Sequence, residues 1–130
     1  MNLVNLTPHA INIMAGEFVF DAAAKCYRVP AGALIPAPAL IIESAGIARC
    51  AVQDTDLPAL DVNGTPVPCC GVTFGAIEGL PAPVDGTIYI VSAIVANAAR
   101  AQGRTDVAVP ARMVRDEAGH ILGCLALALR

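Results

Sequence analysis

Apolar residues occur along this chain in short runs that are separated by polar residues and turn signals, the pattern of many short β-strands. Leu3-Val4-Asn5-Leu6 and Ile11-Asn12-Ile13-Met14 place polar residues between apolar ones, which is typical of strands with one buried face. Between them, Thr7-Pro8-His9 predicts a bend, because the proline nitrogen has no hydrogen to donate to a neighbouring strand. The chain is therefore expected to begin with two strands separated by a bend.

Further strands are predicted wherever β-branched and other apolar residues gather between turn signals. We expect them at residues 18–20, 25–29, 40–42, 47–52, 66–77 and 120–129. Residues 54–64 are interpreted instead as an exposed excursion that ends in Asn63-Gly64, a strong turn signal.

One segment predicts a central strand followed by a helix. Residues 87–91 are nearly all apolar and either β-branched or aromatic, as in a strand that is covered on both faces. Ser92 is well placed as the helix N-cap and Gly103 as the residue that ends the helix, which gives a helix at about residues 93–102. The side of this helix that is expected to be buried carries Ile94, Val95, Ala98 and Ala99.

These elements together predict the fold class. A strand at residues 107–109 after the helix would complete a βαβ unit. We expect an α+β fold that is mostly β, with a mixed sheet of short strands and one principal helix. The chain has 130 residues, which is about the length of one domain, and we expect residues 1–130 to share a core without metals or disulfides.

Composition narrows the classes of function. Hydrophobic residues make up 56% of the chain, but three prolines interrupt residues 29–42 and residues 88–99 are too short to span a bilayer, so we expect no membrane segment. The net charge is −3, the basic residues are scattered and there is no Trp to stack on bases. These features argue against a nucleic-acid partner.

The five cysteines favour a reducing cytoplasm over a disulfide framework or a zinc site, because their number is odd and none forms a C-x-x-C pair. Adjacent Cys69-Cys70 could be a redox or metal pair, although we favour two small apolar side chains on a strand. Neither a P-loop, a G-x-G-x-x-G nor an H-E-x-x-H motif occurs, and we expect no cofactor and no metal.

The candidate ligand-binding residues stand at the ends of apolar elements: His9, Ser92, Arg104, Asp106 and Arg115. His9 could be a general base, a ligand contact or a group that satisfies the backbone at the bend. Ser92 lacks the glycines of a nucleophile elbow, so we expect a helix cap beside backbone N–H groups that favour an anion. The two arginines could form internal ion pairs or a fork that holds a phosphate or carboxylate.

A surface depression is expected beside Ser92. Ligands of open α/β sheets settle at the carboxyl ends of strands, where helix N–H groups and loop side chains converge. The carboxyl end of the strand at residues 87–91 should therefore open into this depression, with Arg104 or Arg115 at its rim.

Several phrases of the chain resemble a family of small proteins of unassigned activity that tailed phages and bacterial prophages encode. The phrases are Asn5-Leu6-Thr7-Pro8-His9, Phe74-Gly75-x-x-x-Gly79-Leu80-Pro81, Gly86-Thr87-Ile88-Tyr89-Ile90-Val91-Ser92, Arg104-x-Asp106, Pro110 and Arg115-Asp116-x-x-Gly119. The resemblance covers the first ten residues and roughly residues 73–124, whereas residues 33–70 depart from it. It implies a phage-encoded accessory protein that acts in the host bacterial cytoplasm.

Two hypotheses of different class follow. The first is a non-catalytic binding protein that acts on a host process by contacting a host protein or by sequestering an anionic small molecule. Its low charge and apolar edges also predict a homo-oligomer. The alternative is a small hydrolase or transferase for a nucleotide-like substrate, with His9 as base, Ser92 holding the anion and Arg104 or Arg115 clamping the phosphate. A role as a part of the virion is a third hypothesis.

Overall fold

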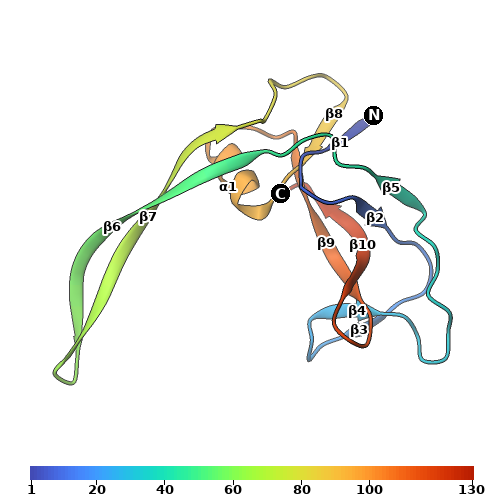
Figure 1. Ribbon diagram of the computed structural model, residues 1–130, viewed down its shortest axis with the longest axis horizontal. Coiled ribbons are helices and arrows are strands. Elements are labelled where there is room, and N and C mark those ends of the chain that lie inside the picture. Colours follow the sequence, from blue (N-terminus) through green and yellow to red (C-terminus); the bar gives the residue numbers. More distant parts are fainter.

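Short apolar strands and tight turns build most of this computed structural model, which describes all of residues 1–130 (Figure 1). In chain order the elements are β1 (Asn2–Asn5), β2 (Ile11–Ile13), β3 (Val19–Asp21), β4 (Cys26–Arg28), β5 (Leu40–Ile42), β6 (Arg49–Val62), β7 (Thr65–Glu78), β8 (Thr87–Ile90), α1 (Ala93–Ala101), β9 (Val107–Arg115) and β10 (Ile121–Ala128). The predicted α+β class, mostly β with one principal helix, is confirmed.

The main sheet mixes parallel and antiparallel pairs in the order β1-β8-β9-β10-β2-β5. The strands β1, β8 and β9 are parallel, β10 is antiparallel to β9, β2 is parallel to β10, and β5 is antiparallel to β2. The hairpin of β3 and β4 joins this sheet because β4 also pairs with β9. Since β8 has a parallel neighbour on each side, its continuous apolar sequence is that of a central strand, as predicted.

The predicted βαβ unit is present as β8, α1 and β9. The Ser92 hydroxyl caps α1 by accepting a hydrogen bond from the Val95 backbone N–H at 3.4 Å, and Gly103 follows the helix with a φ of 86°. The prediction that Ile94 is buried is wrong, because its side chain is 49% exposed while Ala96 is fully buried. The buried side of the helix is therefore rotated away from Ile94 and toward Ala96, relative to the side that the apolar spacing indicated.

Two apolar clusters lie on opposite faces of the sheet, since successive strand residues point in opposite directions. The cluster beneath α1 consists of Leu6, Ala48, Tyr89, Val91, Val95, Ala96, Ala99 and Val107. The cluster on the other face consists of Ile11, Ile42, Ile90 and Cys124. Burial raises the pKa of the Cys124 thiol, so that this side chain behaves as a small neutral apolar group.

The buried side chain of Asn5 joins the start of the chain to β5. Its Nδ2 donates to the carbonyl oxygens of His9 at 2.8 Å and Ile42 at 3.0 Å. Its Oδ1 accepts from the backbone N–H of Thr7 at 2.9 Å and from the Thr7 hydroxyl at 2.6 Å. All four hydrogen-bonding positions of the amide are therefore used inside the protein.

The strands β6 and β7 form a separate two-stranded arm that stands away from the rest of the molecule (Figure 1). Each strand has 14 residues, and the turn at the tip is Asn63-Gly64, with φ values of 52° and 82°. Positive φ at both positions is the requirement of the hairpin turn that the sequence predicted here. The excursion predicted at residues 54–64 is exposed, but residues 54–62 belong to β6 because their backbone pairs with β7, with a shift of register between Leu57 and Leu60.

The base of the arm is fastened to the body by apolar contacts and by one glycine. Cys50 and Ile77, which face each other across the arm, pack against the cluster beneath α1. At Gly79, where β7 ends, φ is 80° and a Cβ atom would lie 2.5 Å from the Ile47 carbonyl oxygen. Only glycine fits this close approach of two backbones, which sets the point where the arm leaves the body.

Replacement of Asn5 by Ala should lower the free energy of unfolding by about 2–4 kcal/mol, because it leaves the buried Ile42 carbonyl and the partly buried His9 carbonyl without their donor. Urea unfolding followed by circular dichroism measures this change. The control is Asn2→Ala, which alters an exposed asparagine of the same strand and should change stability by less than about 0.5 kcal/mol. Equal effects of the two changes would contradict the role assigned to Asn5.

Candidate functional site

A cleft of about 1010 Å³ lies between the β3–β4 hairpin, the loop that follows β4 and the turn between β9 and β10. Its volume is at the upper end of the range of about 300–1,000 Å³ found for small-molecule sites. The charged residues that line it are Asp21, Arg28, Arg115, Asp116 and Glu117, and its apolar lining includes Val19, Phe20, Ile35 and Leu122.

The hairpin that forms one wall is shaped by its own turn. The Asp21 Oδ1 accepts hydrogen bonds from the backbone N–H groups of Ala23 and Ala24, both at 3.1 Å, and Lys25 completes the turn with a φ of 52°. The rings of Phe20 and Tyr27, on facing strands, lie 5.2 Å apart at an interplanar angle of 59°. Such a tilted aromatic pair stiffens the hairpin.

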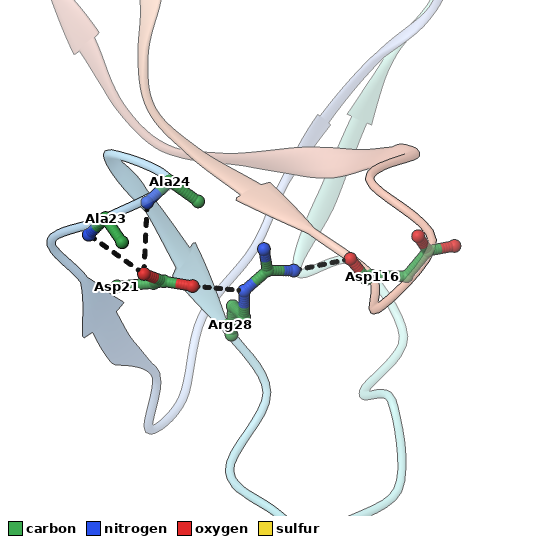
Figure 2. Close-up of polar contacts among 5 residues, drawn as sticks. All are labelled: Asp21, Ala23, Ala24, Arg28 and Asp116. Carbon is green, nitrogen blue, oxygen red and sulfur yellow. Dashed lines mark hydrogen bonds and ion pairs between the residues drawn. The ribbon is translucent and has the colours of Figure 1, made fainter.

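Arg28 ties this hairpin to the turn after β9, as Figure 2 shows. Its Nε donates to the Asp21 Oδ2 at 2.8 Å, and its Nη1 donates to the Asp116 carbonyl oxygen at 2.6 Å. The remaining nitrogen makes no hydrogen bond within the protein and points away from both partners (Figure 2). The guanidinium is thus held in place while part of its donor capacity stays free.

Arg115 and Asp116 lie on the opposite wall, where β9 ends. The Arg115 Nη1 donates to the Gly119 carbonyl oxygen at 2.8 Å. The Asp116 carboxylate accepts from the His120 backbone N–H at 2.8 Å and lies 3.3 Å from the His120 Nδ1. The hydrogen bond from the His120 backbone is the main cause of the lowered pKa of Asp116. This carboxylate therefore stabilises its own turn.

Charge in the cleft follows from these contacts. The hydrogen bond with Arg28 lowers the pKa of Asp21, and the same bond raises the pKa of Arg28. Both groups are therefore ionised at neutral pH. Three carboxylates and two guanidinium groups line the cleft. The carboxylates of Asp21 and Asp116 are engaged by donors of the protein and that of Glu117 makes no hydrogen bond, whereas each arginine keeps N–H groups that no protein atom accepts. The cleft can consequently donate hydrogen bonds to an anionic group from two sides.

Arg104 and Asp106, two of the residues singled out in the sequence, form an ion pair outside this cleft. The Arg104 Nε and Nη2 each lie 2.8 Å from one carboxylate oxygen of Asp106, and Nη2 also donates to the Pro81 carbonyl at 2.8 Å. Their side chains are only 19% and 15% exposed. Of the two alternatives for Arg104, an ion pair or an open fork for a ligand, the contacts are those of the ion pair.

His9 and Ser92 also lie outside the cleft. The imidazole of His9 is exposed and makes no hydrogen bond, while its carbonyl oxygen serves the bend by accepting from the Asn5 side chain. Ser92 is exposed and caps α1. No hydrogen bond links either side chain to Arg104 or Asp106. Ser92 does not line this cleft, so the depression expected beside Ser92 is a different place from the cleft.

Of the five candidate ligand-binding residues, Arg115 is the one that lines the cleft, and Asp21 and Arg28 of its other wall were missed. Asp21 and Arg28 flank a short turn, and this spacing could have suggested a cross-strand ion pair. The contact of Arg28 with residue 116 joins positions 88 residues apart, which no local pattern reveals.

Comparisons of the chain with known protein families, with curated proteins and with solved structures found no match. No helix of the structure has the length and apolar character needed to cross a membrane. No three side chains of His, Cys, Asp or Glu are grouped so that they could hold a metal ion. The geometry of the cleft is therefore the basis for the functional proposal.

Replacement of Asp106 by Asn should lower the free energy of unfolding by about 1–2 kcal/mol at pH 7, because the bidentate ion pair with Arg104 is lost. The pKa of Asp106 is lowered in the folded protein, chiefly by its hydrogen bond with Arg104. The contribution of the pair is therefore complete above the unfolded pKa of about 3.9 and is lost as pH falls through the folded pKa.

Urea unfolding at pH 7, 5 and 3 tests this prediction. The stability difference between the wild type and Asp106→Asn should shrink at the lowest pH. The control Asp85→Asn changes an exposed carboxylate that makes no hydrogen bond, and it should leave stability nearly unchanged. A difference for Asp106→Asn that is the same at every pH would show that the ion pair is not its cause.

Proposed function

We propose that this protein is a non-catalytic binding protein that sequesters a small molecule with an anionic group and an apolar body. The observation that carries the proposal is the presence of Arg28 and Arg115, from distant segments, in one cleft with the exposed aromatic ring of Phe20. Ligand sites generally combine an apolar wall with a few convergent polar groups, and this cleft has that composition.

The chemistry of the two arginines supports an anionic ligand group. Guanidinium groups donate two parallel hydrogen bonds to phosphate or carboxylate and stay charged at physiological pH. Arg28 is already held by Asp21 and by the Asp116 carbonyl, so little side-chain freedom is lost when a ligand binds. A fixed donor of this kind favours an anion over the water that it replaces.

The composition of the lining supports binding over catalysis. The cleft residues include no His, Ser, Thr, Cys, Lys or Tyr, and two of the three carboxylates, Asp21 and Asp116, are engaged by donors of the protein, so that Glu117 is the one unengaged group that could act as a nucleophile or base. The alternative of a small hydrolase or transferase relied on His9 and Ser92, and both lie outside the cleft. No observation favours that alternative.

The resemblance of the chain to proteins of tailed phages and prophages supports the setting of the proposal. In that setting, a phage-encoded accessory protein acts on a host process in the bacterial cytoplasm by withdrawing an anionic metabolite. The free cysteines agree with a reducing compartment. Contact with a host protein is the other route by which such an accessory protein would act.

Titration with phenyl phosphate, followed by NMR chemical shifts of the protein, tests the proposal. Phenyl phosphate should shift resonances of the residues that line the cleft, while benzyl alcohol, which lacks the anion, should bind much more weakly. Arg115→Ala should weaken binding of phenyl phosphate by about 10- to 100-fold, the effect of a lost hydrogen bond to a charged group. The matched control is Arg112→Ala, an exposed arginine of the same strand that does not line the cleft.

Two outcomes would overturn the proposal. One is the absence of shifts around the cleft at millimolar phenyl phosphate. The other is an equal loss of affinity in Arg115→Ala and Arg112→Ala, because non-specific attraction of the anion would then explain the binding. Circular dichroism of both variants confirms that each is folded before it is titrated.

A further inference from the structure

The arm of β6 and β7 presents two chemically different faces. Residues that pair across the two strands point to the same face. The uncharged face is defined by Gln53, Thr55, Leu57, Leu60 and Val62 of β6 with Thr65, Val67, Cys69, Gly71 and Thr73 of β7. The acidic face is defined by Val52, Asp54, Asp56 and Asp61 of β6 with Pro66, Cys70, Val72 and Phe74 of β7.

A register shift gathers apolar side chains on the outer half of the uncharged face. Leu57 and Leu60 are three residues apart and would point to opposite faces of a regular strand. The pairing shifts between Leu57↔Cys69 and Leu60↔Val67, and because Cys69 and Val67 are two residues apart, both leucines point the same way. The side chains of Leu57, Leu60, Val62 and Val67 are 50%, 61%, 51% and 40% exposed.

This outer half has no core of its own. A two-stranded hairpin alone is at best marginally stable in water, and it needs a packed face to persist. The arm contacts the body only near its base, through residues such as Cys50 and Ile77. A row of apolar side chains on an otherwise unsupported ribbon marks a surface that another molecule covers.

Charge and the proline positions limit what that molecule is. Residues 50–77 carry three aspartates and no basic residue, which disfavours nucleic acid and anionic membranes. The rest of the chain holds eight acidic and eight basic residues and is therefore balanced. Pro58, Pro66 and Pro68 interrupt the open edges of the outer arm, so a partner strand cannot extend the ribbon there. The remaining mode of association is contact through the uncharged face of the arm.

The area available favours a reciprocal arrangement of two copies. The uncharged face runs from Gln53 to Val62 of β6, a length of roughly 33 Å, and a ribbon about 10 Å wide then offers about 330 Å² on that face. One arm lying on one partner would bury only about 660 Å² in total, less than the roughly 1,200 Å² at the lower end of standard interfaces. Two arms exchanged between two copies would bury about 1,300 Å² and reach that range.

We propose that this chain forms a two-fold dimer by arm exchange, in which the uncharged face of each arm lies across the body of the other copy. The same surface patches then meet twice, as two-fold symmetry requires. The apolar side chains of the outer arm leave water in this arrangement, while the three aspartates of the acidic face stay in solvent. The proposal does not depend on the ligand of the cleft.

Light scattering coupled to size-exclusion chromatography at micromolar concentration tests the dimer. The wild type should have twice the 13.3 kDa mass of one chain. Leu60→Lys places a charge on the uncharged face and should shift the mass to that of a monomer. Val72→Lys places the same charge at a similarly exposed position of the acidic face, opposite Asp54, and should remain a dimer. A monomeric wild type, or equal behaviour of the two variants, overturns the proposal.

A cross-linking measurement separates arm exchange from the packing of one arm on the other. In a Cys50→Ser, Cys70→Ser background, Cys69 is the cysteine left outside the core, because Cys26 and Cys124 are buried. In an exchanged dimer the two Cys69 thiols lie on separate arms that rest on opposite bodies, so a short bis-maleimide should not link the subunits. An efficient link between the two Cys69 thiols would overturn the exchange.

Discussion

The amide of Asn5 is the interaction on which the arrangement of the sheet depends. It lies at the end of β1, where the chain must turn toward β2 while β5 approaches from the other side. A buried amide that uses both donors and both acceptors stabilises one backbone arrangement and no other, since any shift leaves a buried polar group unsatisfied. The bend after β1 and the approach of β5 are thereby fixed together. The short strands of the sheet gain their register from contacts of this kind as much as from apolar burial.

Two arginine–aspartate pairs illustrate how similar groups acquire different roles. Arg104 is bound to Asp106 through both ends of its fork and also to the Pro81 carbonyl, so it fastens a connector to the βαβ unit. Arg28 makes one bond to Asp21 and one to a backbone carbonyl, and it keeps free donors beside an apolar wall. The number of unused donors and the neighbouring cleft make the difference, because both pairs consist of the same two residue types, although they are separated by seven and by two residues in the sequence.

The arm and the body are stabilised by different interactions. In the body, α1 and the sheet bury apolar side chains on both faces of a central strand. In the arm, backbone pairing continues for 14 residues on each strand although almost no side chain is buried. Hydrogen bonds of a solvent-exposed ribbon contribute little net free energy, because water competes for the same groups. The proposed exchange of arms would give this ribbon a second surface to pack against.

Local sequence determined much of the secondary structure, and tertiary structure decided the site. Asn63-Gly64, Ser92 and Gly103 act through their own backbone preferences, so the turn and both ends of the helix could be predicted from the residues alone. The alternating apolar residues likewise indicated most of the strands and the α+β class. The cleft could not be predicted, because Arg28 meets the turn after β9 only when β4 pairs with β9 across the fold. Distant neighbours also decide that Arg104 forms an ion pair whereas Arg115 lines a cleft. The number of donors that a side chain keeps free depends on which acceptors the folded chain places next to it.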